Sequence, residues 1–209
     1  MTASTVSDPV HHHEDRDTIG RRWRGGVILL ILADAAFVAS FVFAYFYLRG
    51  LNTEGVWLAK GQRIAPIWVG WVIAAILIVS AAAYRWGRVG LARGKRSRLL
   101  VGVAVALLLV IVDLVVQFVQ LATLSFGAGH SAYASCIYVL GGANIFHLLL
   151  TAFLGLGVLN RGRLDKYAAD NDWQVHIIGI WWSWIAVAAV ITALTTSFVA
   201  SPNHIHILG

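Results

Sequence analysis

Residues 31–49, ILADAAFVASFVFAYFYLR, are apolar almost throughout and carry one acid, Asp34, near their start. They belong to an apolar block at 27–48, and about twenty such residues in a helix are enough to cross a bilayer of about 30 Å. An ionisable group at membrane depth is costly in lipid, so Asp34 is expected to face protein or a polar cavity. The stretch therefore predicts a membrane-spanning helix with an acid near the middle of the membrane.

Four further apolar blocks follow, at 67–86, 99–126, 133–159 and 175–200. The 209-residue chain is 59% hydrophobic and only 12% charged, whereas about 25% of the residues of a soluble domain are charged. We predict an all-α, polytopic membrane protein, with a bundle of five transmembrane helices as one domain over 25–200. The connections are short, so any function is expected to reside in the bundle.

The ends of the chain are expected to differ from this domain. Residues 1–24 are predicted to form a flexible cytoplasmic arm and 201–209 an outward-facing tail. A signal peptide does not fit, because the first block is too long and lies behind a polar arm. The tract at 11–13, three consecutive histidines, is interpreted as a surface tract, with a metal site or a tag remnant as open alternatives.

The basic residues predict how the chain is oriented, because cytoplasmic loops collect Lys and Arg. Three fall on one side, Arg49, Lys60 and Arg63. Thirteen fall on the other: Arg16, Arg21, Arg22, Arg24, Arg85, Arg88, Arg93, Lys95, Arg96, Arg98, Arg161, Arg163 and Lys166. We therefore expect a cytoplasmic N-terminus and an outward C-terminus. The net charge of +6 then reflects topology and does not indicate nucleic-acid binding.

Polar residues recur inside the later blocks. Asp113, Gln117 and Gln120 are spaced i, i+4, i+7 and form a stripe on one helix face, which is expected to be buried. Asn144 and His147 are spaced i, i+3 and share a face of the next helix. Each such residue can act as interhelical hydrogen-bonding glue, worth about 0.6–2 kcal/mol, or can serve a function. The chain contains none of the common nucleophile, metal-ligand or phosphate-loop motifs, and no catalytic residue or metal site is predicted.

Two segments carry a family resemblance. In the first, Ala33 and Asp34 precede a Phe-rich run that ends in Ala44 and Tyr45. The second is SCIYVLGGANIFHLLLTAFLG at 135–155. Together they resemble the subunit III family of cytochrome c oxidase, in which a Ser-Glu pair precedes such a run and a later helix reads FYLLTGFHGLHV.

The two matches, and two weaker ones, place individual residues. Alignment on Tyr138 sets Gly142 on the motif's Gly, Asn144 on its first His and His147 on its second. The segment VQFVQLATL matches a family segment in which a Gln precedes a Glu-aromatic pair; Gln120 fits, and Thr123 replaces the Glu. DWQVHIIGIWWSWIAV resembles the family's YWHFVDVVWLFLF helix, with Trp173 and His176 loosely placed and Gly179 at the family's Asp.

The resemblance implies a divergent, five-helix bacterial form of subunit III in the cell inner membrane. Such a subunit has no metal or haem of its own. It packs on the haem-copper subunit I, in a complex that also contains subunit II, and it holds structural phospholipids in a cleft and supports proton uptake. The resemblance makes Asp34, His147 and Asn144 the candidates for the lipid cleft and proton side. Asp113, Gln117 and Gln120 remain a buried polar stripe.

Three alternatives stay open, the first from the family resemblance and the other two from the residues. The first is the related accessory subunit of nitric oxide reductase. The second is a small proton-coupled transporter that uses Asp34 and Asp113, although no internal repeat or Pro-broken span is found. The third is a di-haem or copper membrane protein that uses histidines such as His147 and His176.

Overall fold

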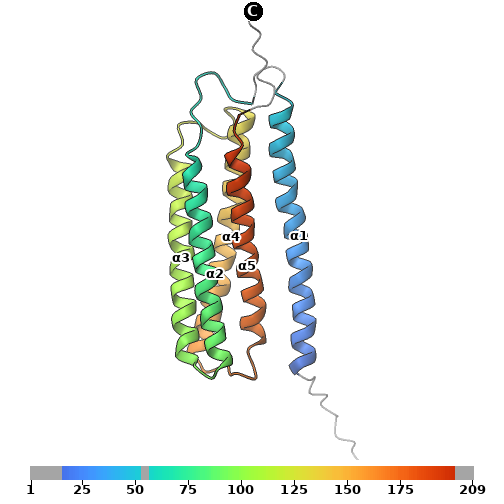
Figure 1. Ribbon diagram of the computed structural model, residues 1–209, viewed down its shortest axis with the longest axis vertical. Helices are drawn as coiled ribbons and strands as arrows, with labels where there is room; N and C mark the ends of the chain where they lie inside the picture. Colours follow the sequence, from blue (N-terminus) through green and yellow to red (C-terminus); the bar gives the residue numbers. More distant parts are fainter. Residues whose placement is uncertain (1–15, 53–56, 201–209) are drawn as a thin grey trace, which may run out of the picture.

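The computed structural model describes residues 16–52 and 57–200 and contains five long helices (Figure 1). They are α1 (Arg16–Gly50), α2 (Ile67–Ala92), α3 (Arg96–Ala122), α4 (Ala132–Arg163) and α5 (Trp173–Ser197). All five are long and apolar enough to cross a membrane. The predicted fold class and the five spans are confirmed. Which end faces the cytoplasm remains a prediction, as do the assignments at 1–15 and 201–209, including the three-histidine tract, which lie outside the described residues.

The helix bounds differ from the apolar blocks where polar residues can extend a helix. α1 begins at Arg16, inside the segment assigned to the arm, and α2 continues to Ala92. Basic side chains at the end of a membrane helix can reach the headgroup region, so hydropathy alone does not show where the helix stops. α3 ends at Ala122, earlier than its block, and both the backbone N–H and the hydroxyl of Thr123 donate to the carbonyl of Val119 there.

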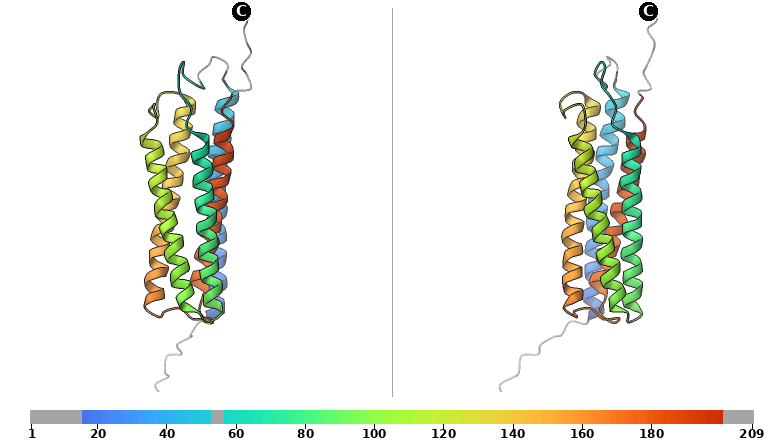
Figure 2. Two further views of the ribbon diagram at one scale, coloured as in Figure 1. Left: turned by 60° about the vertical axis from the view of Figure 1, so that its left-hand side comes forward. Right: turned by 90° about the vertical axis from the view of Figure 1, so that its left-hand side faces the viewer.

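Helices α2–α5 form a four-helix bundle, and α1 stands at its edge (Figures 1 and 2). Within the described residues, α1 contacts α4 and α5 but neither α2 nor α3. α2 and α3 approach very closely where two glycines meet: a Cβ on Gly102 would lie 2.6 Å from the Cα of Gly87. Small residues at such a crossing let two backbones pack directly against each other.

The centre of the bundle combines apolar packing with a few satisfied polar groups. The rings of Tyr84 and Trp182 stack at 4.6 Å. The Trp182 indole donates to Ser80 at 2.9 Å, and the Ser80 hydroxyl donates to the carbonyl of Ala106 at 2.8 Å. Both donors of this Trp182–Ser80–Ala106 series have an acceptor, so the three helices α2, α3 and α5 are joined by satisfied hydrogen bonds.

A second cluster holds α1 to the bundle near Gly50. Trp57, in the connection after α1, is fully buried and donates its indole N–H to the carbonyl of Val199 at 2.8 Å. Its ring meets those of Tyr45 from α1 and Tyr133 from α4 edge to face. At this end, α1 is therefore fixed by packing and hydrogen bonds near the start of α4 and the end of α5.

Candidate functional site

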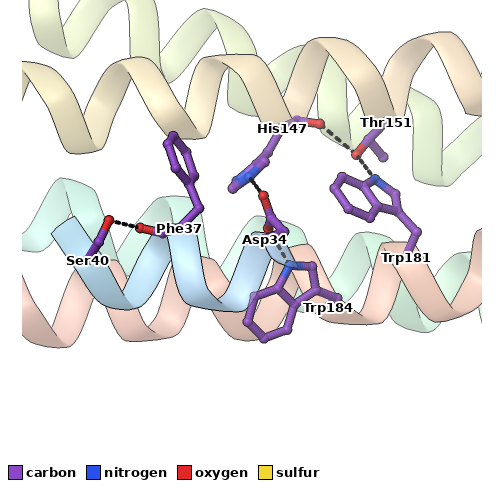
Figure 3. A network of polar contacts seen from close by, with 7 residues as sticks. All are labelled: Asp34, Phe37, Ser40, His147, Thr151, Trp181 and Trp184. Atoms are coloured by element: carbon purple, nitrogen blue, oxygen red, sulfur yellow. Dashed lines mark hydrogen bonds and ion pairs between the residues drawn. The ribbon is translucent and has the colours of Figure 1, made fainter. Parts of the chain in front are cut away.

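Asp34 connects α1 to two other helices. It lies about halfway along Gly20–Gly50, the membrane-spanning part of α1. Its Oδ1 is 2.9 Å from Nε2 of His147 on α4, and its Oδ2 accepts a 2.6 Å hydrogen bond from the indole of Trp184 on α5 (Figure 3). The side chains of Asp34 and His147 are only 12% and 5% exposed. Both carboxylate oxygens thus have partners, and the pair is largely buried.

The position of His147 is set by its own helix and by α5. Thr151, one turn further along α4, donates to the backbone carbonyl of His147 at 2.7 Å. Its hydroxyl in turn accepts from the Trp181 indole at 3.0 Å, and the Trp181 ring meets the imidazole nearly edge-on at 6.0 Å (Figure 3). A carboxyl and an imidazole held in hydrogen-bond contact can share or pass on one proton.

Asp34 also lies on the wall of a groove between α1 and α4. A hollow of about 500 Å³ is bordered by Asp34, Phe37 and Phe41 from α1 and by Gly142 and Phe146 from α4. Apart from Asp34, its walls are apolar. An apolar groove along two membrane helices is suited to an acyl chain, and Asp34 is the single polar side chain on the wall of this one, about halfway along the helix.

A second hollow, of about 760 Å³, lies between α1, α4 and α5 toward the start of α1. Its walls include Leu30, Phe153 and Trp181, and its far end reaches Asn160 and Arg161. Apolar walls that lead to the Arg161 side chain match the order of an acyl chain and a phosphate headgroup in a phospholipid.

The other candidates lie where α4 faces α3. The Asn144 amide donates to Oε1 of Gln117 at 2.9 Å, and the Gln117 amide donates to Oε1 of Gln120 at 2.8 Å. These three side chains line a cavity of about 40 Å³ that lies among α2–α5. Asn144 is therefore joined to the buried stripe, whereas Asp34 and His147 are joined to each other.

Asp113 belongs to neither hydrogen-bonded group. It is completely buried, and neither carboxyl oxygen has a hydrogen-bond partner within 16–52 and 57–200. The i, i+4 spacing places it one turn from Gln117 but does not join the two side chains. The three residues of the stripe thus share one face of α3, but only Gln117 and Gln120 are joined by a hydrogen bond.

At Thr123 and Gly179 this sequence lacks an acid that the family pattern has, and each position has other contacts. The Thr123 hydroxyl, just after the end of α3, donates to the carbonyl of Val119. At Gly179, an added Cβ would lie 3.1 Å from the Tyr84 ring, so that ring occupies the space of a side chain.

Sequence reasoning missed Trp184, Trp181 and Thr151 as members of the Asp34 site. A tryptophan in an apolar helix usually serves in packing or as an interfacial anchor. The sequence does not show which acceptor its indole N–H will bond to. The i, i+3 spacing of Trp181 and Trp184 and the i, i+4 spacing of His147 and Thr151 were available as clues. These spacings identify members of the Asp34 site only once α5 is known to lie beside α1 and α4.

Comparison with known proteins identifies the family. The family model described as cytochrome c oxidase subunit III matches residues 5–198. The chain is 22% identical to cytochrome c oxidase subunit 3 of Prototheca wickerhamii, with 84% of this chain and 71% of that protein covered. It is 25% identical to the subunit 3 of Arabidopsis thaliana, with 85% and 70% covered, and 26% identical to that of Drosophila yakuba, with 81% and 68% covered. The resemblance seen in the sequence is confirmed: the chain belongs to the cytochrome c oxidase subunit III family.

Proposed function

We propose that this chain is the non-catalytic subunit III of a haem-copper terminal oxidase in a bacterial inner membrane. It packs directly on subunit I, in a complex that also contains subunit II, and the haem and copper centres belong to those partners. Membership of the subunit III family over residues 5–198 supports this assignment, as do five helices able to cross a membrane. The large apolar side chains exposed along them suit contact with lipid or with other membrane subunits.

The further proposal is that the two hollows beside α1 hold structural phospholipid. One hollow has apolar walls that include Phe37 and Phe146, and the other has apolar walls that include Leu30 and Phe153 and reaches Arg161 at one end. Acyl chains would lie along the apolar walls, and the Arg161 guanidinium would pair with a phosphate. Lipid in this position would fill the hollows that the loose docking of α1 leaves open.

The observation that carries a role in proton supply is the pairing of Asp34 with His147 at 2.9 Å. A buried carboxyl with two partners, on the wall of the lipid groove, is the kind of group that takes up and releases protons within a membrane. In the proposed function, Asp34 and His147 help to sustain proton delivery to subunit I. Asn144, Gln117 and Gln120 act inside the bundle as interhelical glue.

The test of this assignment is a gentle detergent purification of the native chain, with an optical spectrum and mass-spectrometric identification of what co-purifies. We expect a large haem-copper subunit and haem absorbance. A nitric oxide reductase as the co-purifying partner would redirect the assignment to that complex. A chain that emerges alone and colourless would overturn it, and proton-coupled transport by the chain would then be measured in vesicles.

Lipid retention is tested separately in the same preparation. Native mass spectrometry should detect phospholipid bound to the subunit, and Arg161→Gln should reduce the retained amount. Arg163→Gln is the matched control: Arg163 lies two residues away at the same helix end and outside the hollow. Equal lipid retention in the two variants would contradict the placement of the headgroup.

A further inference from the structure

A pocket of about 220 Å³ lies at the end of the bundle where α1 ends and α2 begins. Its walls come from two connections, one before α2 and one between α3 and α4. The polar or charged side chains that line it are Lys60, Gln62, Arg63, Ser125 and His130. The connection before α2 extends beyond the ends of α2 and α3 (Figures 1 and 2). The pocket is therefore built outside the apolar spans.

The first wall is a tight turn before α2. The backbone N–H of Gln62 donates to the carbonyl of Ala59 at 2.9 Å, and Gly61 has a φ of 76°, as the third residue of a type II turn requires. The Ala59 N–H donates in return to Oε1 of Gln62 at 3.0 Å. Because a backbone N–H can only donate, this bond also settles which atom of the Gln62 amide is the oxygen.

The second wall is held by hydrogen bonds from α4. The Tyr138 hydroxyl donates to the carbonyl of Phe126 at 3.0 Å, and Phe126 is buried. The Ser135 hydroxyl donates to the carbonyl of Ala128 at 2.7 Å. Both walls are thus fixed by contacts within this chain, and a ligand would meet a pocket that is already formed.

The donors around the pocket are unused. Nε2 of Gln62 is buried and has no hydrogen-bond partner within 16–52 and 57–200. A buried donor without an acceptor is rare and costly in a folded protein. The exposed side chains of Lys60, Arg63 and His130 also make no ion pair or hydrogen bond in the part of the chain that the structure describes. Several donors therefore lie around one hollow with no acceptor for them.

The charges of the pocket do not cancel. Lys60 and Arg63 carry two positive charges, and His130 has at least one donor N–H in either protonation state. No acid is among the described residues that line the pocket, and the sequence has none in 57–66 or 123–131. An unbalanced positive charge in a hollow attracts an anion.

The anion that fits best is a carboxylate carried by a protein. A carboxylate can accept several hydrogen bonds and pairs with an arginine fork. The hollow is several times larger than the share of about 30 Å³ that one water takes in the liquid, so a small inorganic anion would leave most of it unfilled. The methylene groups of an acidic side chain would pack on Phe126, which lines the same hollow.

We propose that this pocket docks an Asp or Glu side chain of a neighbouring subunit. Its carboxylate is held by Lys60, Arg63 and the amide of Gln62. Arginine is enriched at protein interfaces, and the position beyond the helix ends is open to a protein domain on that side of the membrane. The inference deepens the proposed function and rests on it, because the partner is a member of the oxidase complex.

The test is zero-length cross-linking of the purified, assembled complex with a water-soluble carbodiimide. This reagent joins an amine to a carboxylate that touches it, as an amide, with loss of water. Mass spectrometry of the peptides should find Lys60 coupled to an Asp or Glu of another subunit. The haem absorbance of the same preparation tests the proposed function separately, so the two can fail independently.

Two comparisons show whether an ion pair holds the carboxylate. Arg63→Gln should lower the coupling of Lys60 several-fold, whereas Arg49→Gln should leave it unchanged. Arg49 is the matched control because it lies at the same end, outside the pocket, and donates to the carbonyl of Ala200. In the unmodified complex, which does not depend on a variant folding, an ionic strength of about 1 M should also lower the coupling, since the Debye length is then about 3 Å.

Three results would overturn the proposal. In the first, Lys60 couples to no other subunit in a complex that shows haem absorbance, which would leave the pocket to a small anion or a lipid. In the second, Lys60 couples only to an acid of its own chain, such as Glu54, which lies outside the described residues. In the third, neither Arg63→Gln nor high salt lowers the coupling, so that Lys60 is only close to the acid.

Discussion

The seam between α1 and the rest of the molecule differs from the interior of the α2–α5 bundle. Inside the bundle, Gly87 and Gly102 bring two backbones into direct contact, and apolar side chains fill the remaining space. Along the seam, α1 is held by separate polar and aromatic contacts near its start, middle and end, at Arg24, Asp34 and Tyr45. Grooves remain between these contacts.

The difference indicates that the bundle and the seam have different roles. Close packing tolerates little change in shape, so the bundle is suited to be a scaffold. A seam with separate contacts leaves room for lipid and places an ionisable group beside it. The predictions below compare substitutions in the two regions, from the largest expected effect to the smallest.

Gly102→Ala should have the largest effect on stability, because its new methyl group would lie 2.6 Å from the Cα of Gly87. We expect a loss of about 1–3 kcal/mol from overpacking, measured as a lower thermal unfolding midpoint of the detergent-solubilised protein. Gly26→Ala is the control, since nothing lies within 4 Å of a Cβ there, and it should be close to neutral. Equal effects of the two substitutions would show that the glycine contact is unimportant.

Asp34→Ala should come second. It leaves the Trp184 indole without its acceptor and His147 without its partner, at a cost of about 1–2 kcal/mol. The same unfolding measurement applies, with Ser40→Ala as control because the Ser40 hydroxyl bonds to Phe37 within α1. If Asp34→Ala unfolds at the temperature of the control, the contact does not hold α1 in place.

Trp184→Phe should cost about 1 kcal/mol, because it removes one hydrogen bond and keeps an aromatic ring. In an Asp34→Ala background it should cost less, since its acceptor is already gone. Trp68→Phe, at a ring that is 67% exposed, should have no effect. Additive losses in the double variant would mean that Trp184 and Asp34 act independently.

Asn144→Leu should have the smallest effect, about 0.6 kcal/mol, the average for a hydrogen bond between membrane helices. Its partner Gln117 lines a cavity of about 40 Å³, which has room for water to replace the lost donor. A loss as large as that of Asp34→Ala would mean that the buried stripe is a principal support of the bundle.

Much of this comparison could be predicted from the sequence, and some of it could not. The five spans follow from the long apolar blocks. Inside a membrane, a single apolar segment can satisfy its own backbone hydrogen bonds only as a helix. The start of α1 at Arg16 did not follow, because the polar residues before the block carry no hydropathy signal. Asp34 was a candidate because an acid is costly in a membrane, whereas His147 became a candidate through the family resemblance, and their pairing was not predicted.

The partners of the polar residues required the arrangement of the helices. Asn144 and His147 share a face of α4, yet one bonds to α3 and the other to α1. Three residues of spacing turn a helix by about 60° short of a full turn, which is enough to reach two different neighbours. Spacing along one helix therefore cannot decide between them, and Trp184 could be assigned only once α5 was known to lie beside Asp34.

The most direct test of the division between seam and bundle is the rate of proton uptake by the assembled complex during oxygen reduction. It should be compared in complexes carrying Asp34→Ala or Asn144→Leu, with equal subunit content and haem spectra. We expect Asp34→Ala to slow proton uptake and Asn144→Leu to leave it at the rate of the unmodified complex. Equal rates in all three complexes would contradict a role of the Asp34–His147 pair in proton supply.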